Sequence, residues 1–132
     1  MTTPIFKEYC SYLHKSKEKY GEKTVLLMQV GSFYEIYAIL KDDQEAGEIN
    51  IYHLCQNIMN IAVAKKTDDI LMGGFQLPYS EKYIKVLIEH GYTIVLVKQM
   101  SEPPNPDRGV SIVISPGTYM EYTDTTTSYI MS

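Results

Sequence analysis

The chain has 132 residues, of which 45% are hydrophobic and 21% are charged, and sixteen acids against twelve bases give it a formal net charge of −4. This length and composition are typical of one globular domain. No apolar run reaches the ~20 residues that a membrane-spanning helix needs, and the N-terminus lacks the basic start and apolar stretch of a secretory signal. We therefore expect an intracellular, non-secreted protein. The acidic balance disfavours a chain that binds DNA by itself through the phosphates.

Few residues in the sequence could support metal or catalytic chemistry. Cys10 and Cys55 lie far apart, and without a secretory signal we expect both to be reduced thiols. The three histidines are scattered, and no cluster of His, Cys and carboxylates has the spacing of a metal site. Neither a phosphate-binding loop nor a nucleophile motif is present. The sequence therefore predicts no metal site, no catalytic residue and no cofactor in this chain.

The first third of the chain predicts a helix followed by two strands. Apolar side chains recur every three or four positions over residues 4–20, with Thr3 as the candidate N-cap of this helix. A short apolar run over residues 25–30 predicts a buried strand. Gly31 marks a tight turn before a second extended segment, residues 33–39, and we expect the two strands to pair antiparallel around it.

The rest of the chain alternates between short strands, helices and loops. Residues 41–50, including Glu48, are polar and acidic and predict a solvated loop, while the proline-rich residues 103–109 predict an exposed loop. The remaining predicted elements are a short helix over residues 51–59, strands over 61–65 and 70–75, a helix over 81–90, and strands over 92–98 and 110–114. We expect Tyr52 to point inward and Ser80 to cap the later helix. Five or six strands with about three helices predict an α/β or α+β fold built on one mixed sheet.

One pair of residues directly after the predicted turn is unusual for a strand. In an extended backbone, residues two positions apart point the same way, so Phe33 and Glu35 share one face and Tyr34 and Ile36 share the other. A phenyl ring beside a carboxylate is a poor core pair. It suits a site where the ring stacks on a nucleic-acid base and the carboxylate contacts the edge of that base. Tyr34 is expected in the core.

The sequence around this pair resembles a known family. Residues 31–37, Gly-Ser-Phe-Tyr-Glu-Ile-Tyr, are similar to the Gly-Asp-Phe-Tyr-Glu-Leu-Phe signature in the N-terminal mismatch-recognition domain of the DNA mismatch-repair protein MutS. Five further blocks resemble the family in the family's own order: residues 61–66, 71–79, 83–91, 97–99 and 113–118. The ordered set, spread over roughly residues 5–118, carries the resemblance, and it implies a fold like that of MutS domain I.

The resemblance also implies roles for particular residues. Phe33 matches the aromatic residue that wedges into the base stack at a mispair from the minor groove, and Glu35 matches the acid that hydrogen-bonds the mispaired base. Lys65 and Lys66, the one adjacent basic pair in the chain, match a basic position near the DNA backbone and are candidate phosphate contacts. The residues expected to support the wedge are Gly31, Ser32, Met72 and Gly73.

The same resemblance implies a larger protein around this domain. Residues 1–118 would be the mismatch-recognition domain, and residues 119–132 a tail or the start of a connector to a following domain. The full-length family protein is a homodimeric ATPase that binds ATP and magnesium in a C-terminal domain, so this chain itself is expected not to be an enzyme. Other domains of the same protein would clamp the DNA backbone, which reconciles the acidic charge with binding to double-stranded DNA that carries mismatches or small loops.

Three alternatives stay open at the level of sequence. The sequence of residues 31–37 also fits a divergent branch of the family with a C-terminal HNH nuclease, found in giant viruses and octocoral mitochondria. Membership of that branch would make the compartment viral or organellar. The chain could instead be a MutS-like protein-interaction module without mismatch sensing, a reading that its acidic charge favours and its Phe33–Glu35 pair disfavours. A small α/β enzyme acting on a nucleotide is disfavoured because phosphate-loop, metal and nucleophile motifs are missing.

Overall fold

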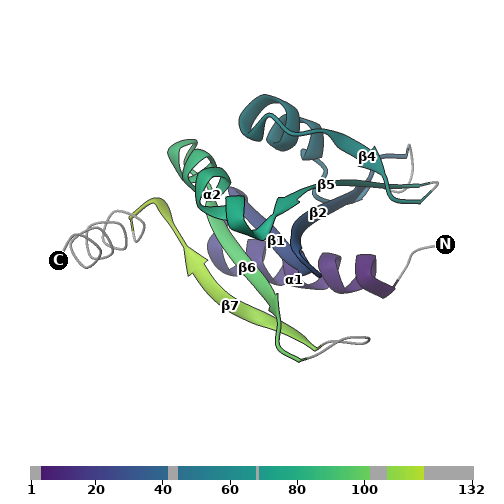
Figure 1. Cartoon of the computed structure of the whole chain (residues 1–132), viewed down its shortest axis with the longest axis horizontal. Helices are drawn as coiled ribbons and strands as arrows, with labels where there is room; N and C mark the ends of the chain where they lie inside the picture. Colours follow the sequence, from purple (N-terminus) through teal and green to yellow (C-terminus); the bar gives the residue numbers. More distant parts are fainter. Residues whose placement is uncertain (1–3, 42–44, 68, 102–106, 118–132) are drawn as a thin grey trace.

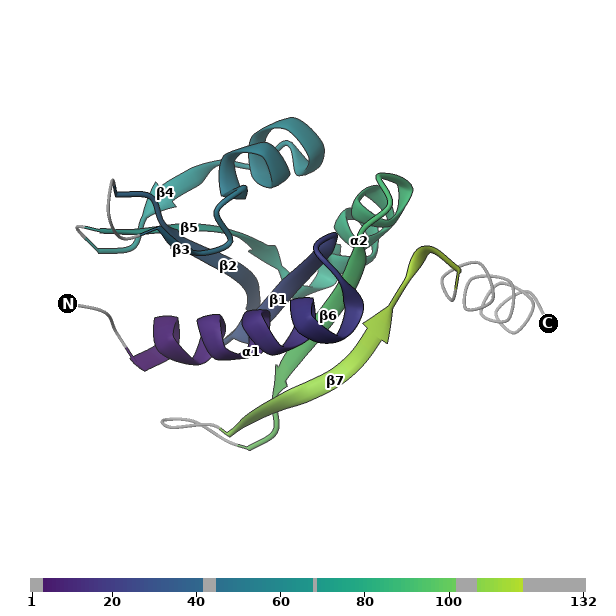
Figure 2. The ribbon, with the colours of Figure 1, turned by 180° about the vertical axis from the view of Figure 1, so that it is seen from behind.

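The computed structural model describes residues 4–41, 45–67, 69–101 and 107–117, which form one mixed β-sheet with helices on both faces (Figures 1 and 2). Within these residues the sheet has seven strands in the order β4-β5-β2-β1-β6-β7, and the two-residue β3 pairs with β2. The predicted α+β class is confirmed. The strand that the sequence did not predict is β3, which lies within residues 41–50, the segment predicted as a loop.

The helices and strands follow the predicted order. They are α1 (Pro4–Tyr20), β1 (Thr24–Val30), β2 (Phe33–Ile39), β3 (Ala46–Gly47), the π-helix η1 (His53–Met59), β4 (Val63–Lys65), β5 (Ile70–Gln76), the 3-10 turn η2 (Leu77–Tyr79), α2 (Ser80–Glu89), β6 (Thr93–Gln99) and β7 (Arg108–Ile114). The predicted antiparallel hairpin is confirmed, since Val30 of β1 pairs with Phe33 of β2 across a two-residue loop. Strand β1 also pairs with β6 in the parallel direction, which makes the sheet mixed.

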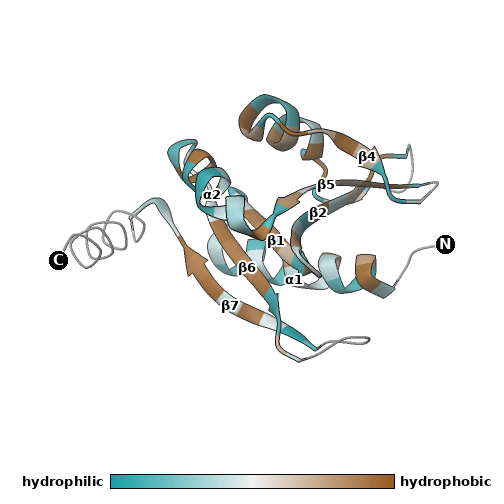
Figure 3. Ribbon diagram, viewed as in Figure 1, coloured by the Kyte–Doolittle hydropathy of each residue, from teal (hydrophilic) through white to brown (hydrophobic). Residues whose placement is uncertain are grey.

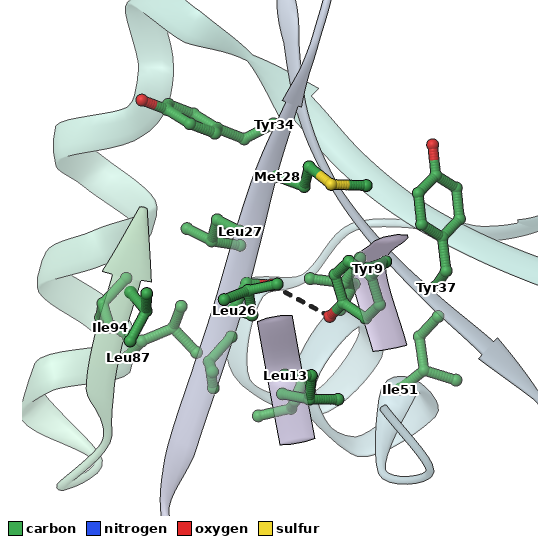
Figure 4. Close-up of a cluster of buried hydrophobic side chains, with 14 of the residues drawn as sticks. Tyr9, Leu13, Leu26, Leu27, Met28, Tyr34, Tyr37, Ile51, Leu87 and Ile94 are labelled. Carbon is green, nitrogen blue, oxygen red and sulfur yellow. Dashed lines mark hydrogen bonds between the residues drawn. The ribbon is translucent and has the colours of Figure 1, made fainter. Parts of the chain in front are cut away.

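Aromatic side chains fill the core on both faces of the sheet. On the face covered by α1, the ring of Tyr9 meets the ring of Tyr37 edge to face with 5.5 Å between centroids, and its hydroxyl donates to the Leu26 carbonyl at 3.0 Å (Figure 4). On the opposite face, Phe75 packs between Tyr34 and Tyr83 of α2, with ring centroids 6.1 and 4.5 Å away. Tyr34 is therefore in the core, as predicted. Hydrophobic residues run along much of β1 and β6 between these layers (Figure 3).

Three predictions about single side chains are wrong. Glu48 is not solvated: β3 pairs with the end of β2 and carries the residue after it into the interior, where Glu48 is 2% exposed. Tyr52 does not point inward but is 44% exposed. Ser80 is the first residue of α2, and the cap position before it is held by Tyr79 without a side-chain hydrogen bond.

Most of the predicted exposed loop over residues 103–109 lies outside the described residues, and its last two residues, Arg108 and Gly109, belong to β7. The guanidinium of Arg108 donates to the Gln29 carbonyl at 2.9 Å and to the Glu8 carboxylate at 3.1 Å. These bonds tie β7 to β1 and to α1, so Arg108 has a structural role. The predicted N-cap Thr3 and the predicted tail, residues 119–132, lie outside the described residues.

Candidate nucleic-acid interface

The candidate interface begins at the loop between β1 and β2. Gly31, the first residue of this two-residue loop, has φ of +61°, a conformation that L-residues with a side chain rarely adopt. Nothing lies within 4 Å of the position that a Cβ would take there. Glycine is therefore needed for the backbone conformation and not for space. A positive φ at the first loop residue is typical of the type II′ hairpin turn, whose twist matches that of the flanking strands.

Two glutamine side chains hold this loop in place. The Gly31 N–H donates to Gln99 Oε1 at 2.5 Å, and Gln29 Nε2 donates to the Gly31 carbonyl at 3.1 Å. The Gln99 N–H donates in turn to Gln29 Oε1 at 2.9 Å. On the other side, the N–H of Leu77 donates to the Ser32 carbonyl at 2.9 Å. The turn is thus fixed by hydrogen bonds from β1, β6 and the segment that follows β5.

Sequence reasoning did not assign this role to Gln29 or Gln99. Each is a polar residue near the end of an otherwise apolar strand, next to the turn in space. That polarity was the one signal available. Their partnership joins residues 70 positions apart, and no local pattern predicts such a contact.

Phe33 projects from the braced turn into solvent. It is the first residue of β2, lies opposite Val30 on one side and Gln76 on the other, and is 39% exposed. The next residue, Tyr34, points to the opposite face and is buried. The ring of Phe33 is therefore accessible to a ligand, while the backbone that carries it is held in the sheet.

Glu35 lies behind Phe33 on the same face of β2, and its side chain is only 10% exposed. Its Oε1 accepts a hydrogen bond from the Tyr37 hydroxyl, and the ammonium of Lys66 lies 3.8 Å from the same oxygen. Burial, and then the neighbouring carboxylate, raise the pKa of Tyr37 well above its ordinary value, so its hydroxyl stays protonated and acts as the donor.

The two predicted lysine contacts lie in different surroundings. Lys65 is exposed at the end of the edge strand β4. Lys66 follows it, with its N–H bonded to the Ile70 carbonyl at 2.7 Å, and its ammonium lies 5.3 Å from the centre of the Tyr37 ring. The structure therefore brings Lys66, and not Lys65, to the candidate site.

The two predicted supporting residues of β5, Met72 and Gly73, do not lie opposite Phe33, which pairs with Gln76. Gly73 pairs with Ile36, and Met72 pairs with Tyr37. A Cβ at Gly73 would collide with the Cys55 sulfur of η1, so this glycine permits the helix to pack closely. The residue directly beside Glu35 is Gly74, where a Cβ would lie 2.7 Å from the Tyr34 carbonyl and 3.1 Å from Glu35 Cγ. Gly74 thus makes room for the acidic side chain.

The described residues offer little support for metal binding or nucleophilic catalysis. Within them, no group of three or more His, Cys, Asp or Glu side chains could hold a metal ion. Burial raises the pKa of the Cys55 thiol to about 12, so this sulfur is not a nucleophile near neutral pH. Across the same described ranges, no helix is both long and apolar enough to cross a membrane.

The fold and the candidate interface define an α+β domain that presents one aromatic ring from a braced hairpin. The sequence matches the MutS domain I family over residues 3–123. It is 32% identical to the DNA mismatch repair protein MutS of Fervidobacterium nodosum, over 98% of this chain and 14% of that protein. It is also 32% identical to the MutS of Staphylococcus haemolyticus, over 91% of this chain and 13% of that protein.

A mutS homolog of Acanthamoeba polyphaga mimivirus is 30% identical, over 88% of this chain and 11% of that protein. The chain therefore belongs to the MutS domain I family, as its motifs predicted. It spans between a tenth and a seventh of the length of these three relatives.

Proposed function

We propose that this domain recognises mispaired or unpaired bases in duplex DNA as part of DNA mismatch repair, with Phe33 inserted into the base stack. Two observations support the proposal. The chain belongs to the MutS domain I family, and its relatives are named as mismatch repair proteins. Phe33 is an aromatic residue, 39% exposed, that directly follows a turn held by side-chain and backbone hydrogen bonds. This second observation carries the mechanism, because a wedge must be both accessible and rigidly mounted.

The energetics of insertion explain how such a wedge would discriminate. Unstacking a base step requires a few kcal/mol, and the requirement is smallest where pairing is already faulty. Stacking of a base on an aromatic ring returns about 1–3 kcal/mol and tolerates every base. The selection therefore depends on how easily the DNA deforms at the lesion, and not on the identity of the neighbouring sequence.

Glu35 would complete the site as the hydrogen-bond acceptor for the displaced base. It lies two residues after Phe33 on the same face of β2, which is a separation of about 6.6 Å along a strand. A carboxylate near DNA is repelled by the phosphates, so it contributes only where a specific hydrogen bond offsets that repulsion. Across a range of pH, Glu35→Gln should change the preference among different mispairs; an unchanged preference at every pH would exclude Glu35 from recognition.

The acidic charge of the chain limits how this domain could act alone. With a net charge of −4, it has little means of neutralising phosphates, which supply most nonspecific affinity for DNA. We propose that further domains of a larger, homodimeric and ATP-regulated protein hold the duplex, with ATP and magnesium bound outside this chain. The divergent branch with a nuclease domain stays a prediction.

Binding of the full-length protein to matched and single-mismatch duplexes, measured by fluorescence titration, tests the proposal. The Phe33→Ala variant should lose the preference for mismatched DNA while retaining weak binding to both duplexes. Tyr52→Ala is the matched control, because Tyr52 is a comparably exposed aromatic residue at the start of η1. If Phe33→Ala discriminates as well as the parent, the wedge assignment is wrong.

The second candidate is a MutS-like protein-interaction module without mismatch sensing, which the acidic charge favours. The same titration separates the two. An interaction module would bind matched and mismatched duplexes alike, and Phe33→Ala would change neither affinity.

A further inference from the structure

Glu35 has an unusual environment for a carboxylate. This carboxylate is nearly buried, and the oxygen Oε1 is held by two side chains, Tyr37 and Lys66. A buried carboxylate without partners would strongly destabilise the fold, so a partner is expected. The two partners come from β2 and from the turn after β4, and both contact the same oxygen. They therefore offset the charge of the Glu35 carboxylate and also fix the direction in which it points.

We propose that Tyr37 and Lys66 are positioning residues that orient the Glu35 carboxylate toward a displaced base and offset its charge near DNA, and so set the strength of mismatch preference. This inference rests on the proposed function. It assigns no contact with DNA to either residue; both act through Glu35.

Tyr37 is well suited to orient another group, because its own ring is packed in the core. It is fully buried, and the ring of Tyr9 meets it edge to face at 5.5 Å between centroids. Tyr9 is anchored in turn by its hydrogen bond to the Leu26 carbonyl. In Figure 4 the Tyr37 hydroxyl points away from this cluster. The donor that meets Glu35 is therefore held by the core of the domain.

Position 37 also distinguishes this chain from the signature that it resembles. The signature ends in Phe, and the chain has Tyr37 there. The extra hydroxyl is the atom that donates to Glu35. We therefore expect removal of this hydroxyl to weaken the mismatch preference and not to abolish it.

Lys66 supplies the charge that a carboxylate at a DNA surface needs. Its ammonium lies 3.8 Å from Glu35 Oε1 and 5.3 Å from the centre of the Tyr37 ring, and 31% of its side chain is exposed. The pair is neutral as a whole, so the phosphates repel it less than they would repel Glu35 alone. Because both contacts fall on Oε1, the base donor would meet Oε2.

A double-mutant cycle on the full-length protein tests the inference. Tyr37→Phe removes one hydroxyl and keeps the ring, and Lys66→Met removes the charge and keeps an unbranched side chain. Each is measured in the parent and in a Glu35→Gln background, as the ratio of the dissociation constants for matched and mismatched duplexes. The matched controls are Tyr34→Phe, a buried tyrosine on the opposite face, and Lys85→Met, an exposed lysine of α2.

We expect each positioning variant to lower the discrimination ratio by about fivefold in the parent and to have no effect when Glu35 is replaced, as contacting residues that act through one another do. The controls should leave the ratio unchanged. If the variants have the same effect with and without Glu35, or raise the ratio, the inference is wrong. If Glu35→Gln and Phe33→Ala both leave the ratio unchanged, the proposed function itself fails, which is a different result.

The salt dependence of binding separates positioning from phosphate contact at Lys66. If this ammonium bound a phosphate, Lys66→Met would weaken binding to matched and mismatched DNA alike and reduce the salt slope by about one. We expect the slope to be unchanged and Lys66→Arg to restore the ratio. A lower slope with an unchanged ratio would assign Lys66 to the DNA backbone and overturn the inference.

Discussion

The two ends of strand β2 are built from similar residues and have different consequences. Each end has a glycine with positive φ, Gly31 at +61° and Gly47 at +76°, and each has a nearly buried glutamate, Glu35 and Glu48. At the Gly31 end the turn is open to solvent and is held by glutamine side chains. At the other end Gly47, the last residue of β3, is enclosed by the backbone of β2 and the ring of Phe6.

The difference shows which end can carry function. At the enclosed end, Glu48 accepts a backbone hydrogen bond from Asn50 at 3.1 Å, so its contact serves to hold a loop. At the open end, Glu35 is held by side chains and lies two residues from an exposed ring. Local strain and burial are thus common to both ends, and only the open end presents a surface that a ligand could reach.

The largest expected effect is at the enclosed end. A Cβ at Gly47 would lie 2.5 Å from the Tyr37 carbonyl oxygen, and the backbone there has φ of +76°. Gly47→Ala should therefore lower the free energy of unfolding by about 3 kcal/mol, combining backbone strain with a clash that no side-chain rotation relieves. Urea denaturation measures this loss. A change below about 1 kcal/mol would show that Gly47 is less tightly enclosed than the structure indicates.

The same substitution at the open end should have a smaller effect. Gly31 has a positive φ but free space around it, so Gly31→Ala adds only backbone strain, about 1–2 kcal/mol. Thermal unfolding of both alanine variants side by side sharpens the contrast. Equal losses at Gly31 and Gly47 would contradict the distinction between an open and an enclosed glycine.

Glu48 gives the enclosed end a pH dependence. Burial raises the pKa of Glu48 above its ordinary 4.5, although the charge of Lys17 and the Asn50 amide act in the opposite direction. The folded state then binds more protons than the unfolded state, so stability falls as pH rises from below 4.5 through the raised value. Glu48→Gln should remove this fall and increase the free energy of unfolding at neutral pH.

Denaturation of parent and Glu48→Gln between pH 4 and pH 8 measures this difference. The two proteins should converge in stability as the pH falls toward 4, because Glu48 is then neutral. A Glu48→Gln variant that is less stable than the parent at neutral pH would show that the charge of the Glu48 carboxylate stabilises the folded protein.

The smallest effect on stability is expected at Phe33. Since Phe33 is 39% exposed as a residue, Phe33→Ala should lower the free energy of unfolding by only about 1 kcal/mol. Chemical denaturation checks this value. A loss above 2 kcal/mol would mean that Phe33 is part of the core and would remove the distinction between the two ends of β2.

The order of helices and strands could be predicted from local sequence. Helical periodicity over α1, apolar runs in β1 and β6, and the glycine between β1 and β2 each depend on neighbours in the chain. The two-residue strand β3 could not be predicted, because its stability comes from pairing with β2 and not from its own residues. The burial of Glu48 follows from that pairing and was missed for the same reason.

The candidate site also has a part that local sequence predicts and a part that it does not. Alternation along β2 placed Phe33 and Glu35 on one face, and family resemblance gave them roles. The contacts that hold them come from residues distant in sequence: Gln99 lies 68 positions from Gly31, and Lys66 lies 31 positions from Glu35. Such contacts depend on strand order, which a single sequence does not specify.

Insertion of the Phe33 ring into DNA is the central claim, and base unstacking measures it most directly. A fluorescent base analogue that brightens when it unstacks can be placed beside a mismatch in the duplex. Binding of the full-length parent should raise its emission, whereas Phe33→Ala, compared at saturating protein, should leave it at the level of free DNA. An equal rise with Phe33→Ala would show that the duplex opens without this ring and would contradict the account.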